Sequence, residues 1–309
     1  MKRRSFYNGA LNHCYQRTSG HGVLFYSVTD YLVFFTIFCT MALRHKVRVL
    51  KLVQMPDHTH HSTVTCKRGQ LSAFSRDYTS IFAKEYNQAF GLRGSVFETP
   101  FSSALKRSDK DIRTNLIYLD NNPVERKLTT RAEDYRWNYL AYAQSDHPFS
   151  EKIVLRKASM PLRRALDSVK RMHSKGRFLG YCFLKNLFSS ISTKREREQL
   201  IDFIISTYSI IEHQEAISYF GDYQKELLAA HATKGSEYEI SETFIGKDDK
   251  WYSCFTNILL EKGMCKDVHE VLTMPIPEKQ RLFDLLRRET MAPWRQIAAY
   301  LHLPVERIC

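Results

Sequence analysis

Two histidines separated by one residue, His58 and His60, are the first feature of this sequence that indicates chemistry. They lie in the run MPDHTHH at residues 55–61, which follows an apolar run at 46–53 that is typical of a β-strand. Side chains two residues apart in a strand project from the same face, so the two imidazoles would lie side by side and His61 would point the other way. Paired imidazoles on a rigid strand are suited to binding a divalent metal. A His-x-His pair alone is more often structural, so the assignment depends on a second motif.

That second motif, IYLDNNPV at residues 117–124, supplies a nucleophile and a further ligand. It closes a run of helical periodicity that begins near the acidic residues at 109–111, and Pro123 would end this helix. Tyr118 and Asn122 are four residues apart and therefore share one face of the helix. If that face meets the histidine strand, two nitrogen ligands, an amide oxygen and a phenol come together. This combination suits metal-assisted nucleophilic attack on a phosphodiester.

The two motifs together resemble those of the single-tyrosine HUH transposases, and in particular the REP-associated tyrosine transposases, whose motif reads Tyr-Ile-x-x-Asn-Pro-Val. The resemblance covers residues 10–142 and includes the YRW sequence at 135–137, which is similar to a Tyr-x-Trp-Ser sequence of that family. Thr59 stands where the family usually has a bulky hydrophobic residue, and His61 and Ser62 follow it in place of apolar residues. Burial of these last two side chains requires a hydrogen-bond partner for each.

The resemblance implies a ferredoxin-like α+β fold, with an antiparallel sheet and packed helices, that carries metal ligands on a central strand. It implies that His58, His60 and Asn122 bind Mg²⁺ or Mn²⁺, with Mn²⁺ the better match to imidazole. Tyr118 would attack a DNA phosphate, which gives a 5′-phosphotyrosine link and a 3′-hydroxyl. The implied substrate is single-stranded DNA with a hairpin. Basic residues near the tyrosine are expected to contact phosphates, namely Lys106, Arg107, Arg113 and Arg126.

The elements that must position these residues follow the order strand, helix, strand, strand, helix, strand, helix, which matches a ferredoxin-like sheet. Ile112, Leu116 and Leu119 recur at helical spacing in the last helix and would face the core. His13 in the first strand, or His21 in the loop after it, could approach the active site. The expected ranges are 11–17, 31–44, 46–53, 58–66, 70–90, 95–101 and 109–122.

Length and charge indicate two domains and a polyanionic partner. The chain has 309 residues, of which 43% are hydrophobic, and a net charge of +13 that favours nucleic acid. We expect a catalytic domain at 1–148 and a helical, all-α domain at 149–309. The seven cysteines are scattered and form no C-x-x-C, which predicts a reducing compartment. The apolar run at 31–43 is too short to span a bilayer, so no membrane segment is expected.

The C-terminal half shows helical periodicity at 161–175, 194–220 and 222–232, and the first of these runs is basic. Two further helices are expected at 277–288 and 293–301. With a turn and a third helix from residue 305, they resemble a helix-turn-helix that reads the major groove. A small helical packing unit is the alternative interpretation.

The leading hypothesis is a metal-dependent single-stranded DNA transesterase, located with the nucleoid in a bacterial cytoplasm. Members of the family act as monomers or dimers, so a homodimer is compatible with the resemblance. The rival hypothesis is a catalytically decayed or domesticated protein that binds or regulates DNA without cleaving it. A ferredoxin-like sheet also binds RNA in other proteins, but the aromatic signature of those sheets is missing from this sequence.

Overall fold

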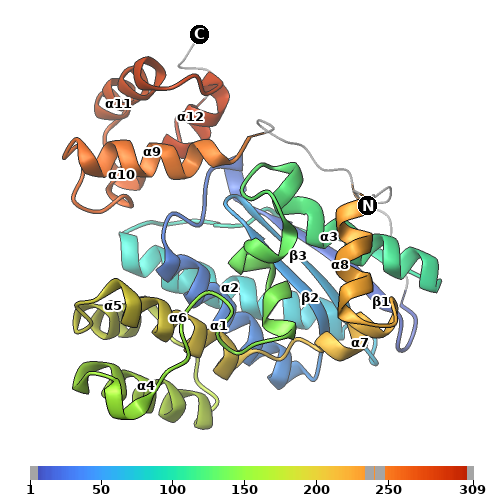
Figure 1. The fold of residues 1–309 in the computed structure, drawn as a ribbon. Coiled ribbons are helices and arrows are strands. Elements are labelled where there is room, and N and C mark those ends of the chain that lie inside the picture. The colour runs from blue at the N-terminus through green and yellow to red at the C-terminus, as the bar shows by residue number, and fades with distance from the viewer. Residues whose placement is uncertain (1–5, 234–239, 241–247, 305–309) are drawn as a thin grey trace.

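The computed structural model describes residues 6–233, 240 and 248–304. A four-stranded antiparallel sheet in the order β2-β3-β1-β4 lies at its centre (Figure 1). This order, with its βαββαβ connections, is that of a ferredoxin-like fold, so the expected α+β fold class is confirmed. The elements of this part are β1 (Leu11–Arg17), α1 (Val28–His45), β2 (Arg48–Met55), β3 (His58–Val64), α2 (Gln70–Phe90), β4 (Ser102–Lys106) and α3 (Asp109–Glu125).

The chain after α3 is helical apart from its connections. Among the described residues, the short 3₁₀ helices after α3 are η2 (Ala132–Asp134), η3 (Arg136–Asn138), η4 (Leu140–Ala143) and η5 (Leu155–Lys157), and a further one, η1 (Ser19–His21), lies between β1 and α1. The α-helices are α4 (Met160–Ser174), α5 (Tyr181–Ser189), α6 (Lys194–Tyr208), α7 (His213–Ser218), α8 (Tyr223–Ala232), α9 (Lys250–Glu261), α10 (Glu270–Thr273), α11 (Ile276–Glu289) and α12 (Trp294–Leu301).

Reciprocal capping fixes where the helices nearest the sheet begin. At the start of α3, the backbone N–H of Asp111 donates to Ser108 Oγ at 3.1 Å, and Ser108 N–H donates to Asp111 Oδ2 at 3.2 Å. At the start of α1, the backbone N–H of Ser27 donates to Asp30 Oδ2 at 2.7 Å. A cap of this kind contributes about 1 kcal/mol, so both helices have a defined first residue.

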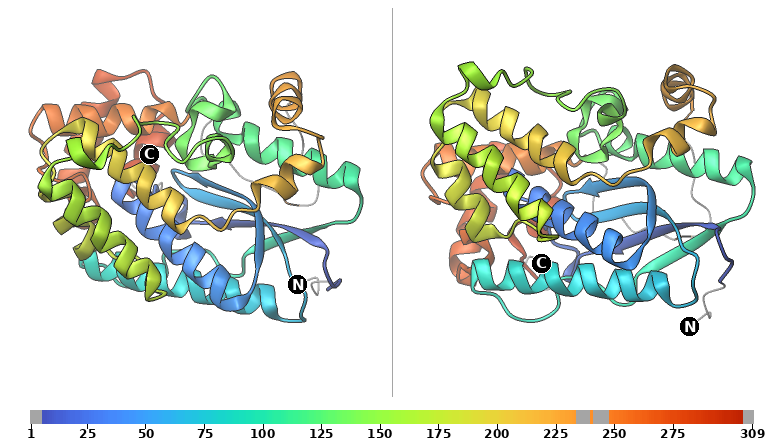
Figure 2. Two further views of the ribbon diagram at one scale, coloured as in Figure 1. Left: turned by 60° about the horizontal axis from the view of Figure 1, so that its bottom comes forward. Right: turned by 90° about the horizontal axis from the view of Figure 1, so that it is seen from below.

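Helices cover both faces of the sheet. The helices α1 and α2 lie on one face, where aromatic side chains from both helices meet the strands, and α3 lies on the other (Figure 2). The apolar cluster beneath α1 continues into α4, α5 and α6 through Leu166, Leu184 and Ile204. A second cluster joins α9, α11 and α12 to Val23 and Tyr26, in the loop that follows β1. The helices α4 to α6 therefore pack onto the sheet domain through the first cluster, and α9, α11 and α12 pack onto it through the second.

Sequence patterns predicted the positions of most strands and helices of the sheet domain. The ranges 11–17 and 70–90 are confirmed, and Ile112, Leu116 and Leu119 are buried as expected. The strand predicted at 95–101 is wrong, because the fourth strand is β4 at 102–106.

The apolar run at 95–101 does not form a strand because its side chains serve the helical layer. Phe97 is buried against Phe34 and Phe82, and its backbone forms an isolated bridge with Thr18. Pro100 has no N–H to donate to a strand ladder. In β4 the buried positions are Ala104 and Lys106 and the half-buried ones are Ser103 and Leu105, so the strand shows no apolar alternation in the sequence.

Two expected helix ends are also corrected. Pro123 lies inside α3, because the backbone N–H of Arg126 donates to Asn122 O at 3.1 Å and continues the helix beyond the proline. The run expected as one helix at 194–220 is divided between α6 and α7. The chain there adds to the edge of β2, where the backbone N–H of Glu212 donates to Val49 O at 2.7 Å.

The expected helices at 277–288 and 293–301 correspond to α11 and α12, whereas the third helix expected from 305 falls outside the described residues. Whether this end reads DNA stays a prediction. No helix in the described part of the chain is long and apolar enough to cross a membrane.

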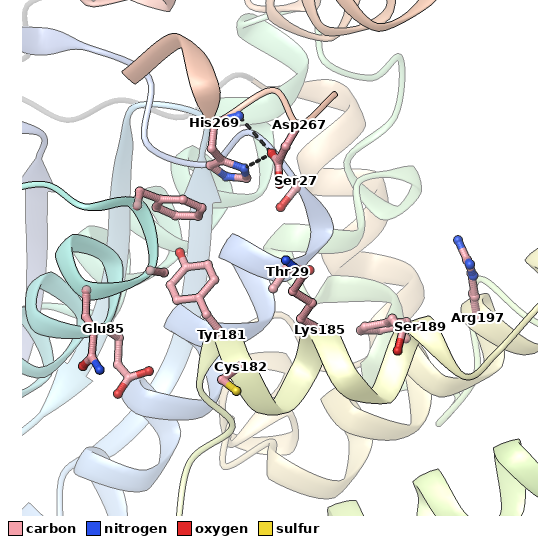
Figure 3. Close-up of a pocket in the computed structure, with 14 residues that line it drawn as sticks. Ser27, Thr29, Glu85, Tyr181, Cys182, Lys185, Ser189, Arg197, Asp267 and His269 are labelled. Atoms are coloured by element: carbon pink, nitrogen blue, oxygen red, sulfur yellow. Dashed lines mark hydrogen bonds and ion pairs between the residues drawn. The ribbon is translucent and has the colours of Figure 1, made fainter. Parts of the chain in front are cut away.

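His269, which precedes α10, joins the C-terminal helices to α1. Its Nδ1 lies 2.6 Å from Asp267 Oδ1 (Figure 3). Its Nε2 lies 2.9 Å from Asp30 Oδ2. Its ring stacks on Phe90 with 4.0 Å between the ring centroids. Burial lowers the pKa of His269, but the two carboxylates more than offset burial and raise the pKa to about 9. The imidazole is therefore protonated at neutral pH and pairs with both carboxylates.

We expect the free energy of unfolding to fall by about 2 kcal/mol between pH 7 and pH 9, because His269 loses its proton in the folded state over this range. A raised folded-state pKa stabilises the fold below the unfolded pKa near 6.5 and loses that contribution as pH rises through 9. Urea unfolding at several pH values measures the effect. A His269→Gln variant should show a flat profile in this window, and an equal slope in both proteins would contradict the assignment.

Candidate active site

The predicted ligands His58 and His60 lie on β3, on the sheet face that α3 covers. In the register of the sheet, Tyr15 of β1 is opposite His60, and Arg17 is opposite His58. The two imidazole centroids are 4.9 Å apart, and the ring of Tyr15 lies 5.4 Å from His58 and 5.0 Å from His60. The alternation of strand side chains thus places the two histidines together, as the motif predicted.

Each imidazole is oriented through its Nδ1 atom. His58 Nδ1 lies 2.5 Å from Asp57 Oδ1, and His60 Nδ1 lies 3.0 Å from His13 Nε2. Asp57 is also 3.5 Å from Arg17. Burial would raise the pKa of Asp57, but His58 and Arg17 together hold it below its usual value. Orientation of one ring nitrogen by a carboxylate is the arrangement that presents the other nitrogen to a metal.

Tyr118 and Asn122 of α3 meet His60, so the structure brings the four residues of the two motifs into one cluster. The amide Nδ2 of Asn122 lies 3.3 Å from the Tyr118 hydroxyl and 3.4 Å from His60 Nε2. The rings of His60 and Tyr118 are perpendicular, with 5.7 Å between their centroids. His13 is 5.9 Å from the Tyr118 ring, so the histidine of the first strand approaches the site. His21 instead has a half-exposed side chain beside Glu98.

The cluster keeps His60 neutral. Burial lowers the pKa of His60 well below its ordinary value, and the neighbouring His58, His13 and His61 lower it further. A neutral imidazole is the form that binds a metal. Two imidazole nitrogens and the amide oxygen of Asn122 are the groups in this cluster that could hold a metal.

Asn122 Oδ1 supports this donor set, because this buried oxygen has no hydrogen-bond donor within the part of the chain that the structure describes. A buried amide oxygen without a donor is free to bind a water molecule or a cation. Carboxylates and thiols do not complete the set: among the described residues, no three His, Cys, Asp or Glu side chains are grouped so that they could hold a metal. The amide is therefore the third protein ligand available here.

A buried lysine holds α3 against the sheet. Lys51 Nζ, from β2, lies 2.6 Å from Asp120 Oδ1 of α3 and 2.9 Å from Glu226 Oε1 of α8. Asn121 Nδ2 adds a hydrogen bond of 2.8 Å to Ala230 O of α8. The helix that carries Tyr118 is therefore fixed between β2 and α8.

The predicted phosphate contacts occupy different environments. Arg107 and Arg113 are exposed, whereas Lys106 is buried at the end of β4. Arg126 is buried and donates to Asp249 from Nε at 3.0 Å and from Nη2 at 2.5 Å. In this conformation, a carboxylate holds the guanidinium that was expected to contact a phosphate.

On the opposite face of β3, His61 belongs to the core. Its Nε2 lies 3.3 Å from the Tyr78 hydroxyl, and its ring contacts Phe38 and Phe74. Burial lowers the pKa of His61 to about 3, so this side chain is neutral. Ser62 also finds a partner, since its Oγ donates to Asn115 Oδ1 at 2.6 Å. His61 and Ser62 therefore each have the hydrogen-bond partner that their burial requires.

Two residues of the cluster, Asp57 and Tyr15, were not predicted to belong to it. Asp57 directly precedes His58, and a carboxylate next to a ligand histidine is the signal that could have identified it. Tyr15 shares a strand face with His13, so the same alternation that placed His13 could have placed the tyrosine.

The cluster is closed to solvent. Tyr118 is 8% exposed, Asn122 2% and His60 0%. Ile240 packs against Tyr15 and Ala104, and the Asp249–Arg126 pair lies at the end of α3. Ile240 and Asp249 thus help to cover the site in this structure.

No protein-family model matches the chain, and no curated protein matches it. Among solved structures, the chain is similar to a REP-associated tyrosine transposase bound to a REP hairpin. The two chains are 19% identical with a TM-score of 0.39, and the similarity covers 44% of this chain and 80% of that chain.

Thr59 lies on the side of β3 that faces the aromatic core. Its buried hydroxyl has no hydrogen-bond partner among the described residues. We expect Thr59→Val to raise the free energy of unfolding by about 1 kcal/mol, because it removes an unsatisfied polar group. Urea unfolding measures the change.

Thr36→Val is the matched control, since the equally buried Thr36 Oγ1 accepts a hydrogen bond from Leu179 N–H at 3.1 Å. We expect this variant to be destabilised by about 1–2 kcal/mol. A loss of stability in Thr59→Val similar to that of the control would show that the Thr59 hydroxyl has a partner.

Proposed function

We propose that this protein is a metal-dependent DNA transesterase in which Tyr118 is the nucleophile. The observation that carries the proposal is the contact of the Tyr118 hydroxyl, the Asn122 amide and the His60 imidazole on two rigid elements. A nucleophile beside potential metal ligands on a supported strand and helix is the arrangement that phosphodiester transfer requires. The motif resemblance adds the substrate class, single-stranded DNA with a hairpin.

In the proposed reaction, Tyr118 gives up its phenolic proton to water, and its oxygen attacks a DNA phosphorus atom. A bond forms between this oxygen and phosphorus, and the bond from phosphorus to the 3′ oxygen breaks. The 3′ oxygen takes up a proton and leaves as a hydroxyl, and the 5′ end stays joined to Tyr118. Attack of a 3′-hydroxyl on the phosphotyrosine reverses the step, so strands are rejoined without an external source of energy.

His58, His60 and Asn122 would hold Mg²⁺ or Mn²⁺ next to Tyr118. Asp57 orients the ring of His58, and His13 orients that of His60. When bound, a divalent metal neutralises charge on the non-bridging phosphate oxygens as attack proceeds. The lowered pKa of His60 keeps this ligand neutral at physiological pH.

DNA can reach Tyr118 when the residues that cover the cluster move. The carboxylate of Asp249 accepts two hydrogen bonds from the Arg126 guanidinium. A phosphate that displaced this carboxylate would accept hydrogen bonds from the same two donors. In the proposed bound state, Arg126 therefore exchanges a carboxylate for a DNA phosphate, while Lys51 keeps α3 in place on the sheet.

The burial of the cluster favours a second candidate function, a DNA-binding protein that does not cleave. Tyr118 and its neighbours would then be a polar core whose hydrogen bonds are kept for stability. The two candidates differ in one product: only the transesterase forms a covalent, metal-dependent adduct through Tyr118.

We expect a covalent adduct when the purified protein is incubated with Mn²⁺ and a labelled single-stranded DNA that carries a hairpin from the flank of its own gene. A denaturing gel would show a slow band that requires the metal. Tyr118→Phe should abolish this band because it removes the attacking oxygen. Mass spectrometry of the digested adduct would place the nucleotide on Tyr118.

Tyr15→Phe is the control for this test, since Tyr15 also lies beside both histidines. It should retain the adduct. An adduct that survives in Tyr118→Phe would exclude this nucleophile, and hairpin binding without an adduct under any metal would support the non-cleaving candidate.

A further inference from the structure

Most of the net charge of the chain lies in a short segment outside the candidate active site. Residues 152–197 contain thirteen Lys or Arg and two Asp or Glu, a net charge of +11 out of +13 for the whole chain. The segment comprises α4, α5, the first turn of α6 and their connections. We call residues 152–197 the basic module.

The charges of the basic module face solvent. Twelve of its thirteen Lys and Arg side chains are exposed, and the thirteenth, Arg163, is half-buried. On α4, Arg164, Arg171 and Lys175 follow one another at seven and four residues, and therefore lie along one face of the helix and its end. The exposed Asp167 lies on the same face between Arg164 and Arg171, so three cations and one carboxylate follow one another along it.

Few of these cations are neutralised within the protein. Among the described residues, Arg195 is the member of the module that forms an ion pair, with Glu151 at 2.6 Å. Lys170 lies over the ring of Phe203, 5.7 Å from its centroid. Glu196 is engaged in capping α4, where it accepts from Ser159 N–H at 2.8 Å. The surface therefore carries a large uncompensated positive charge, which favours a polyanion.

The helices that carry these charges are firmly supported. Leu162, Leu166 and Val169, on the inner face of α4, are buried in the same apolar cluster as α1 and α6. Their apolar face is thus occupied and not available for insertion into a lipid surface. The module lies across α1 from the strands, away from α3 (Figures 1 and 2).

The types of side chain exposed on the basic module indicate whether it would bind single-stranded or double-stranded nucleic acid. Proteins that bind single strands without sequence preference stack bases on exposed aromatic side chains. The aromatic residues of the module, such as Tyr181, Phe183 and Phe188, are buried or half-buried against the core. Binding to a duplex backbone requires charge alone. The module therefore fits double-stranded DNA better than a single strand.

We propose that the basic module binds the sugar-phosphate backbone of double-stranded DNA, independently of sequence. The choice of DNA as the polyanion rests on the proposed function. The module holds the duplex next to the segment to be cleaved, while the single strand is handled at Tyr118. This divides the two tasks between two faces of the molecule.

The test compares the full-length protein with the triple variant Arg164→Gln, Arg171→Gln, Lys175→Gln. Affinity for a blunt duplex DNA without a hairpin is measured between about 50 and about 200 mM salt. Each lost phosphate contact lowers the slope of log affinity against log salt by about 1, so the slope should fall by about 3. The yield of covalent adduct on a short single-stranded oligonucleotide should not change.

The matched control replaces three exposed cations outside the module, Lys67, Arg68 and Lys84, with Gln. It removes the same charge and should leave the slope within about 1 of wild type. An unchanged slope in the module variant, or an equal fall in the control, overturns the proposal. So does a fall seen only with duplex RNA or with anionic phospholipid vesicles in place of duplex DNA.

The two proposals fail in distinguishable ways. If the wild-type protein forms no adduct but loses duplex affinity through the module substitutions, the transesterase proposal fails and the module is supported. If the adduct forms and the module substitutions leave duplex binding unchanged, the module proposal fails alone.

Discussion

The buried ammonium of Lys51 is the interaction on which the candidate site depends. It joins β2, α3 and α8 through Asp120 and Glu226, none of which is exposed to solvent. Loss of the cation would leave two carboxylates buried without a counterion, which costs about 3–5 kcal/mol. Because Asp120 lies between Tyr118 and Asn122 in sequence, the same ion cluster that stabilises the fold also sets the position of Tyr118 over the histidine strand.

The sheet face beneath α3 is unusual in its chemistry. The strands β1 and β3 place His13, Tyr15, His58 and His60 together where apolar side chains would pack with less cost. The opposite face is an aromatic core in which even His61 is held by a tyrosine. One buried face of the sheet is therefore polar and the other is mainly apolar. A buried polar cluster of this kind is expected where residues are retained for function.

Local periodicity was sufficient to predict which side chains share a face within each motif, whereas the meeting of the two motifs was expected from the resemblance. The period of a strand places His58 and His60 on one face, and the helical repeat places Tyr118 above Asn122. Long-range contacts were beyond such patterns. Neither the pairing of Arg126 with Asp249 nor the covering of Tyr15 by Ile240 has a local signal, since both join segments far apart in the chain. The division into domains at residue 148 and the dimer stay predictions.

Direct location of a bound metal tests the central claim most sharply. Crystals grown with Mn²⁺ would be measured at a wavelength where manganese scatters anomalously. We expect a peak between His58 and His60, about 2.0–2.3 Å from one nitrogen of each ring, with the Asn122 side-chain oxygen as a further ligand. No peak at these residues, with His58, His60 and Asn122 in the contacts described here at saturating Mn²⁺, would contradict a metal-dependent active site.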